Sequence, residues 1–216
     1  MELLPEFDCH CHILPGLDDG ASDLEESLFL AAWLASHGYK RAVCTSHRTL
    51  AFPNTPAIVK EAAAKLQAAL DDKGIELKLT PSLEYRLIPE AWPEARRKDW
   101  LLPWEGNHIL VECPIRDRTK MGSLDPFLEI RQLVRDGYQP VLAHPERYLW
   151  ATDSDYKAFR DAGAKFQRNL GSIEGFYRAP VAVRAIWLKE NGFYSFLGTD
   201  LHDTNYARCF DKLLER

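Results

Sequence analysis

The chain has 216 residues, 46% of them hydrophobic and 11% aromatic, so it can bury a sizeable core and is not a disordered protein. Its 27 Lys and Arg against 32 Asp and Glu give a formal net charge of −5, which argues against nonspecific binding to nucleic acids or membrane surfaces. We expect a single domain spanning residues 1–216.

The chain is expected to be cytoplasmic. Its first six residues have neither the basic nor the apolar region of a signal peptide, and no apolar run approaches the ~20 residues of a membrane helix. The five cysteines are irregularly spaced without a C-x-x-C pair, so we expect reduced thiols. A zinc cluster at residues 9–12 (CHCH) is disfavoured, because strand alternation would place the two cysteines opposite the two histidines.

Strand-like and helix-like stretches alternate along the chain. Strands are expected at residues 7–13, 41–45, 75–85, 108–113, 139–143, 164–170 and 193–198. Helices are expected between Ser22 and Gly38, from Thr55 to Gly74, at residues 124–136, from Asp153 or Ser154 to Gly163, at residues 179–191, and briefly at the end. In the first helix, Ser22 and Glu25 match a capping box. Residues 89–103, which include Trp92 and Trp100 and are followed directly by Trp104, are expected to pack a loop onto the domain, with a lid or an interface as the alternative.

This alternation predicts a parallel α/β fold, either an open sheet or a closed barrel. Neither G-x-G-x-x-G nor G-x-x-x-x-G-K-[ST] is present, which excludes the usual nucleotide-binding sheets. Reactive side chains follow six of the seven strands, and they converge on one point only if the strands form a ring. The sequence therefore favours a seven-stranded barrel with its site at the carboxyl ends of the strands.

Nine side chains at these strand ends are candidate metal ligands. His10 and His12, two apart on a strand, face the same side, and Asp200 and His202 repeat that spacing. Taken singly, each has a structural explanation: the two histidines can be hydrogen-bonded core residues, and Asp18-Asp19-Gly20 is a common turn. The complete set comprises His10, His12, Asp19, His47, Glu84, Glu112, His144, Asp200 and His202.

Five histidines and four carboxylates are too many ligands for one ion and suit two or three divalent ions sharing carboxylates. Mixed shells of this kind favour Mn²⁺, Fe or Zn²⁺ over Mg²⁺ or Cu. Such a cluster activates a bridging water for attack on a phosphoryl centre. Arg147 is the leading candidate for binding the phosphate and Arg208 the second, whereas Arg48, Arg86 and Arg116 are expected to be structural.

In this order, the residues resemble the PHP (polymerase and histidinol phosphatase) superfamily, most closely its bacterial metal-dependent protein-tyrosine phosphatases of capsule and exopolysaccharide synthesis. The likeness covers nearly the whole chain. The motifs are DCHCHILPGLDDG at residues 8–20, TSH at 45–47, Glu84, Glu112, HPERY at 144–148 and GTDLH at 198–202.

The resemblance implies a distorted (β/α)7 TIM-like barrel of the PHP type with three divalent ions, most often manganese. The first ion would take His10, His12, Glu84 and Asp200; the second would share Glu84 and add Glu112 and His144; the third would take Asp19, His47 and His202. A metal-bridging hydroxide would attack phosphotyrosine in the tail of a bacterial tyrosine autokinase. Arg147 and Arg208 would hold the phosphate, and Asp200 or a metal-bound water would supply the proton. The segment after His202 is short for this family, so Arg208 is matched less firmly than Arg147.

Other functions stay open at this point. The same cluster would serve a phosphoesterase acting on histidinol phosphate or another small phosphomonoester, or a metal-binding regulatory module without catalysis. A proofreading exonuclease is disfavoured because no polymerase domain accompanies the motifs. Cysteine-based tyrosine phosphatases need an arginine six positions after the cysteine, and none of the five cysteines has one.

Overall fold

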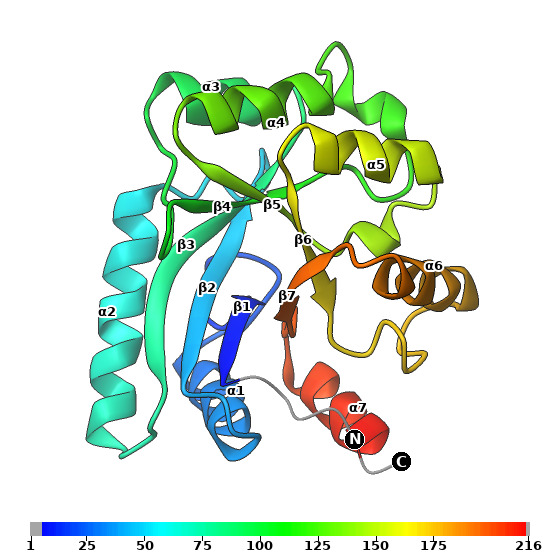
Figure 1. The fold of residues 1–216 in the computed structure, drawn as a ribbon. Helices are drawn as coiled ribbons and strands as arrows, with labels where there is room; N and C mark the ends of the chain where they lie inside the picture. Colours follow the sequence, from blue (N-terminus) through cyan, green and yellow to red (C-terminus); the bar gives the residue numbers. More distant parts are fainter. Residues whose placement is uncertain (1–5, 215–216) are drawn as a thin grey trace.

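The seven strands form one parallel sheet in which every strand pairs with its neighbours in the sequence. The computed structural model of the chain describes residues 6–214, and Figure 1 shows helices surrounding the strands on the outside. The strands are β1 (Phe7–Cys11), β2 (Arg41–Arg48), β3 (Lys78–Arg86), β4 (His108–Glu112), β5 (Gln139–Leu142), β6 (Lys165–Asn169) and β7 (Tyr194–Gly198). The predicted seven-stranded barrel is confirmed.

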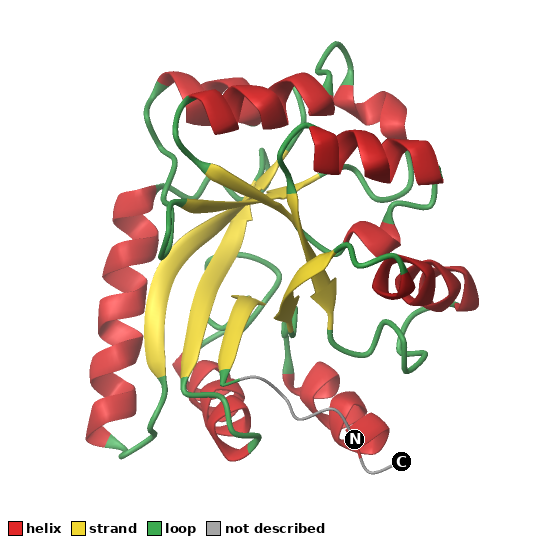
Figure 2. Ribbon diagram, viewed as in Figure 1, coloured by secondary structure: helices red, strands yellow, loops and turns green. Residues whose placement is uncertain are grey.

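The helices lie on the outer surface of the barrel (Figure 2). They are α1 (Leu24–Ser36), α2 (Pro56–Asp72), α3 (Trp92–Arg97), α4 (Pro126–Arg135), α5 (Asp153–Asp161), α6 (Ala179–Glu190) and α7 (Thr204–Leu214), with short 3₁₀ turns η1 (Arg118–Met121) and η2 (Pro145–Arg147). No helix within residues 6–214 is both long and apolar enough to cross a membrane. The five cysteines carry free thiols, and only Cys209 is exposed.

Two predicted helix caps were wrong by one position or more. Asp23, not Ser22, caps α1, because its carboxylate accepts a hydrogen bond from the amide of Glu26 at 2.9 Å. Asp is as good a cap as Ser, and the pair Asp23 and Glu26 has the same spacing as the predicted pair. Thr152, not Asp153 or Ser154, caps α5 and forms a capping box with Asp155.

Two further boundaries differ from the sequence-based expectation. β2 continues beyond residue 45 to Arg48, because it stays in register with β3 as far as the Arg48–Tyr85 pair. The segment 89–103 contains the short helix α3, and Trp92 is buried with its indole nitrogen donating to Glu129 at 2.7 Å. The expectation that this segment packs onto the barrel is therefore met by a helix rather than a loop.

The interior of the barrel is apolar at one end and polar at the other. Leu110 and Glu112, two apart on β4, share a face. Leu110 belongs to a buried cluster with Val43, Val141 and Trp104. The inward faces of the strands thus carry apolar side chains toward the amino ends and ionisable side chains at the carboxyl ends.

The barrel closes between β1 and β7 through a few strong contacts. The amide of Asp200 donates to the carbonyl of His10 at 2.8 Å, and the amide of His12 donates to the carbonyl of Leu201 at 2.9 Å. Below them, the buried Asp8 carboxylate accepts from the Thr199 amide at 2.9 Å and from its hydroxyl at 2.6 Å. These contacts fix the first strand against the last.

We expect Thr199→Val to reduce the free energy of unfolding by about 1–3 kcal/mol, because the isosteric change leaves an oxygen of the buried Asp8 without its hydroxyl donor. Urea denaturation followed by circular dichroism measures the loss. Thr80→Val on β3 is the matched control, because the Thr80 side chain makes no hydrogen bond within the described chain. Equal stability of the two variants would contradict this role for Thr199.

Candidate metal centre

All nine predicted ligands meet at the carboxyl end of the barrel. They form four overlapping groups, and the ligand atoms within each group lie within 4.8 Å of one another. The groups are His12, Asp19, His47 and His202; His10, His144 and Asp200; His10, His12 and Glu84; and His47, Glu84 and Glu112.

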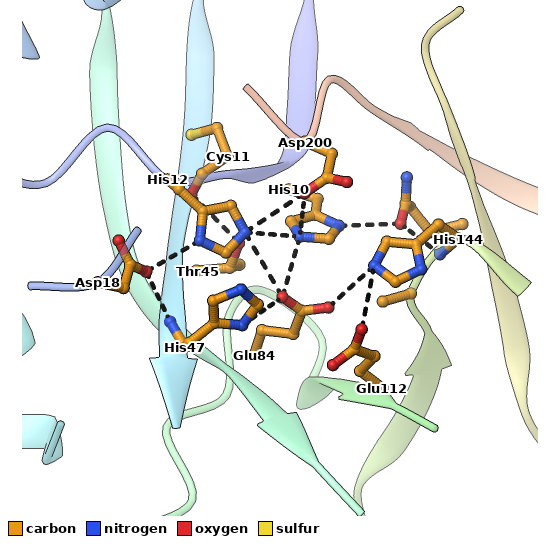
Figure 3. A network of polar contacts seen from close by, with 12 residues as sticks. His10, Cys11, His12, Asp18, Thr45, His47, Glu84, Glu112, His144 and Asp200 are labelled. Atoms are coloured by element: carbon orange, nitrogen blue, oxygen red, sulfur yellow. Dashed lines mark hydrogen bonds and ion pairs between the residues drawn. The ribbon is translucent and has the colours of Figure 1, made fainter. Parts of the chain in front are cut away.

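Glu84, from β3, lies at the middle of this arrangement (Figure 3). Its carboxylate is 1% exposed, with Oε2 lying 3.0 Å from His47 Nδ1, 3.4 Å from His10 Nε2 and 3.5 Å from His12 Nε2. The other oxygen, Oε1, is 3.2 Å from His144 Nε2. Burial alone would raise the pKa of Glu84, but His10 and His47 hold it well below its usual value, so this buried group is a carboxylate.

The arrangement of the ring nitrogens of His10 and His12 shows whether the site suits a cation. Their Nε2 atoms are 3.0 Å apart. The opposite nitrogens each face an acceptor: His10 Nδ1 is 3.0 Å from Gln167 Oε1, and His12 Nδ1 is 2.9 Å from Asp18 Oδ2. Each Nδ1 therefore carries a proton, and both Nε2 atoms face one another and the carboxylates of Glu84 and Asp200. A divalent cation would take the place of any proton held between these atoms, and imidazole nitrogen suits Zn, Fe and related ions.

The outer ligands continue the same pattern. His202 donates from Nδ1 to the carbonyl of Asp200 at 2.7 Å, which leaves its Nε2 lone pair available to a metal ion. Asp19 Oδ1 lies 3.8 Å from His202 Nε2 and 3.3 Å from His47 Nε2. The Asp19 side chain is more than half exposed, so its carboxylate lies at the open side of the site.

Glu112 places a second buried carboxyl group beside Glu84. Burial and the neighbouring Glu84 charge raise the pKa of Glu112 to about 7, and Oε2 of Glu112 lacks a hydrogen-bond donor within the described chain. Arg86 Nε lies 3.3 Å from that oxygen. His144 Nε2 is 3.9 Å from the other oxygen, and burial lowers the pKa of His144 to about 4. A neutral imidazole beside two buried carboxyl groups is a donor set that fits a divalent cation.

Two ligands stand in backbone conformations that are unusual for residues with a Cβ. His144 has φ 32° and Asp200 has φ 54°. Left-handed residues of this kind cost on the order of 1–3 kcal/mol each and persist where surrounding contacts fix them. Gln167 supplies one such contact, because its Oε1 accepts from the His144 amide at 2.9 Å while also facing His10.

Arg147 lies at the rim of a cavity of about 340 Å³ that contains the exposed side of the centre. Its Nη1 donates to Asp200 Oδ2 at 2.9 Å, and its guanidinium lies 4.9 Å from the centroid of the Tyr177 ring. Asn169 Nδ2 donates to the same Asp200 oxygen at 2.6 Å and to the Tyr177 hydroxyl at 2.9 Å. The guanidinium is thus held in place while some of its donors remain available.

The other arginines differ in position. Arg208 is exposed on α7 and does not line the cavity, to which α7 instead contributes Tyr206. Arg48 is buried and pairs with Glu94 at 2.6 Å, as a structural residue would. Arg86, also expected to be structural, lines the cavity beside Glu112.

Sequence reasoning missed the residues that orient the ligands. Asp18 accepts from His12 and from the amide of His47 at 2.7 Å, yet next to Asp19 it looked like part of an ordinary turn. Gln167 and Asn169 are polar, two apart and buried on β6, and that spacing was the available signal for an inward polar face.

Comparisons with known proteins identify the family of the chain. Residues 6–209 match the family model described as capsular polysaccharide synthesis, CpsB/CapC. The chain is 30% identical to tyrosine-protein phosphatase YwqE of Bacillus subtilis over 91% of this chain and 77% of that protein.

Solved structures give the same result for the fold. The chain resembles a structure from a study of YwqE from Bacillus subtilis and CpsB from Streptococcus pneumoniae, described as unique metal-dependent tyrosine phosphatases, with a TM-score of 0.82 and 29% identity over 97% of this chain and 86% of the other. Histidinol phosphate phosphatase from Lactococcus lactis shares the fold, with a TM-score of 0.56 and 16% identity over 97% of this chain and 92% of the other.

We expect Asp18→Asn to weaken Mn²⁺ binding about 10–100-fold, because the charged partner of the His12 Nδ1 proton is lost. Equilibrium dialysis with elemental analysis of the bound metal measures the affinity. Asp161→Asn, an exposed change on α5, is the matched control. If both variants bind Mn²⁺ as tightly as the parent protein, Asp18 does not support the site.

Proposed function

The chain belongs to the CpsB/CapC family of capsular polysaccharide synthesis, and from this premise we propose that it is a metal-dependent phosphatase that hydrolyses phosphotyrosine on a protein substrate. The observation that carries the proposal is the site itself. Six of the nine candidate ligands and the Arg147 guanidinium line one open cavity at the end of the barrel, and the other three, His10, His12 and Glu84, are buried within the same cluster.

The cysteines support a mechanism without a thiolate nucleophile. Four of the five are buried, and burial raises the pKa of Cys9, Cys11 and Cys113. Cys209 is exposed on α7 and does not line the cavity. A buried, protonated thiol cannot attack a phosphate, so hydrolysis must depend on other groups.

The proposal assigns three divalent ions, with manganese as the preferred metal. His10, His12, Glu84 and Asp200 would hold the first; Glu84, Glu112 and His144 the second; and Asp19, His47 and His202 the third. The clustering of these side chains supports the assignment. Bound ions supply an activated water and neutralise phosphate charge.

The protein's own groups position the phosphate and the ligands. Arg147 has five N–H donors, one of which bonds to Asp200, so others can reach phosphate oxygens. Oδ2 of Asp200 accepts hydrogen bonds from Arg147 and Asn169, and Oδ1 lies 3.3 Å from His10 Nε2. Asp200 can therefore hold Arg147 with one oxygen and a metal ion with the other. The phenolate leaving group has a pKa of about 10, so it departs without a strong general acid.

The physiological substrate that we propose is the phosphorylated tail of a bacterial tyrosine autokinase that controls capsule or exopolysaccharide synthesis. Membership of the capsule-synthesis family supports it. A small phosphomonoester such as histidinol phosphate is the competing substrate, and the shared barrel alone does not distinguish the two.

We expect kcat/KM for a phosphotyrosine peptide to exceed that for histidinol phosphate at least tenfold, as judged by phosphate release. EDTA dialysis is expected to abolish the activity and Mn²⁺ to restore it, because the nine ligands hold no nucleophile without ions. Full activity after verified metal removal would contradict metal dependence. A preference for histidinol phosphate would contradict the substrate assignment.

We expect Arg147→Ala to lower kcat/KM for the phosphotyrosine peptide by about 100-fold, since a charge-assisted bond to the phosphate is lost. Steady-state kinetics with the Mn²⁺-loaded proteins measures the effect. Arg131→Ala, an exposed change on α4, is the matched control. Arg208→Ala is measured beside them, and a larger loss there than in Arg147→Ala would reverse the roles given to the two arginines.

A further inference from the structure

We infer that a basic groove beside the metal centre binds acidic residues flanking the phosphotyrosine of the protein substrate, an inference that rests on the proposed function. The basic groove is a cavity of about 570 Å³ between the loop after β4 and the segment before α6. Its cations are Arg86, Arg116, Lys120, Arg147 and Arg178.

The basic groove is continuous with the metal centre. Arg86, Ile115 and Arg147 line both cavities. A peptide whose phosphotyrosine enters the centre therefore has this groove next to its point of exit. An extended chain advances about 3.3 Å per residue, so residues within a few positions of the phosphotyrosine reach the groove.

Three of the five cations of the basic groove have no ion-pair partner among residues 6–214, whereas Arg86 pairs with Glu112 and Arg147 with Asp200. Arg116, Lys120 and Arg178 are exposed, and their side chains form no hydrogen bond or ion pair with any residue from 6 to 214. The one carboxylate in the lining, Asp117, accepts from the amide of Thr119 at 2.9 Å and from its hydroxyl at 2.6 Å. In a chain with a net charge of −5, this concentration of positive charge is local, so an anionic partner would supply what the groove lacks.

The loop that carries two of these cations is fixed before any partner arrives. The Trp150 indole nitrogen donates to the Pro114 carbonyl at 2.7 Å. The Arg118 guanidinium lies 5.3 Å from the Trp150 ring centroid and 5.7 Å from that of Phe127. Arg116 and Lys120 therefore project from an anchored backbone, which lowers the entropic cost of binding.

The lining suits a peptide better than a uniformly charged polymer. Leu149 is 53% exposed and Tyr177 is half-buried, and both line the groove between the cations. Apolar surface among separated charges matches a chain that mixes acidic and apolar side chains. A small aryl phosphate has no flanking residues, so it has nothing to place beside Arg116, Lys120 or Arg178.

The test compares two phosphotyrosine peptides that differ only in glutamate or glutamine at the flanking positions. We expect the parent protein to favour the glutamate peptide about tenfold in kcat/KM, as three exposed ion pairs would give. The triple variant Arg116→Ala, Lys120→Ala, Arg178→Ala should lose this preference while keeping its kcat/KM for p-nitrophenyl phosphate. The triple variant Lys60→Ala, Arg131→Ala, Lys157→Ala removes the same charge from α2, α4 and α5 and should keep the preference.

Binding is measured in parallel with the same two peptides carrying a non-hydrolysable phosphonate in place of the phosphate. Equal Kd values for the acidic and neutral peptides would overturn the inference, whether or not the protein hydrolyses phosphotyrosine. Tighter binding of single-stranded DNA than of the acidic peptide at physiological salt would also overturn it. Absence of hydrolysis together with a retained preference in binding would instead contradict only the proposed function.

Discussion

The site depends on one electrostatic constraint, the burial of the Glu84 carboxylate among four imidazoles. A buried carboxylate is costly without a compensating positive charge, and here ring nitrogens of His10, His12, His47 and His144 lie within 3.5 Å of its oxygens. The same imidazoles bring ring nitrogens close together, as the 3.0 Å separation of the Nε2 atoms of His10 and His12 shows. Carboxylate oxygens and imidazole nitrogens directed to a common point suit a cation, and the closure of the barrel and the orienting residues hold that convergence.

The supporting contacts connect strands that are distant in sequence. Gln167 on β6 orients His10 on β1 and the His144 backbone after β5. Asp8 on β1 accepts a hydrogen bond from Thr199, which directly precedes the candidate ligand Asp200. Glycine is needed where β7 meets β1, because a Cβ on Gly198 would lie 2.6 Å from the Cβ of His10. Stability and site geometry therefore share the same residues.

Spacing and strand order were enough to predict the barrel and the convergence of the nine candidate ligands. Two-residue alternation places His10 with His12, and seven strand–helix units limit the topology. The sequence did not predict which of two neighbouring side chains the tertiary structure directs into the site. Asp18 and Asp19 are adjacent carboxylates, and only the fold shows that Asp18 holds His12 while Asp19 faces the opening. Arg208 and Tyr206 are two apart on α7, and the packing of the helix decides which one reaches the cavity.

The order of the ligands along the chain also affects when the centre can exist during synthesis. The first pair, His10 and His12, stands near the amino terminus, whereas Asp200 and His202 are added about 190 residues later. At roughly 5–20 residues per second, this separation amounts to about 10–40 seconds of translation. A nascent chain therefore holds only fragments of the cluster, and its histidines would meet cellular metals singly. Selection of the correct ions is left to the finished barrel, whose fixed cavity can discriminate by geometry where an unfolded chain would bind by affinity alone.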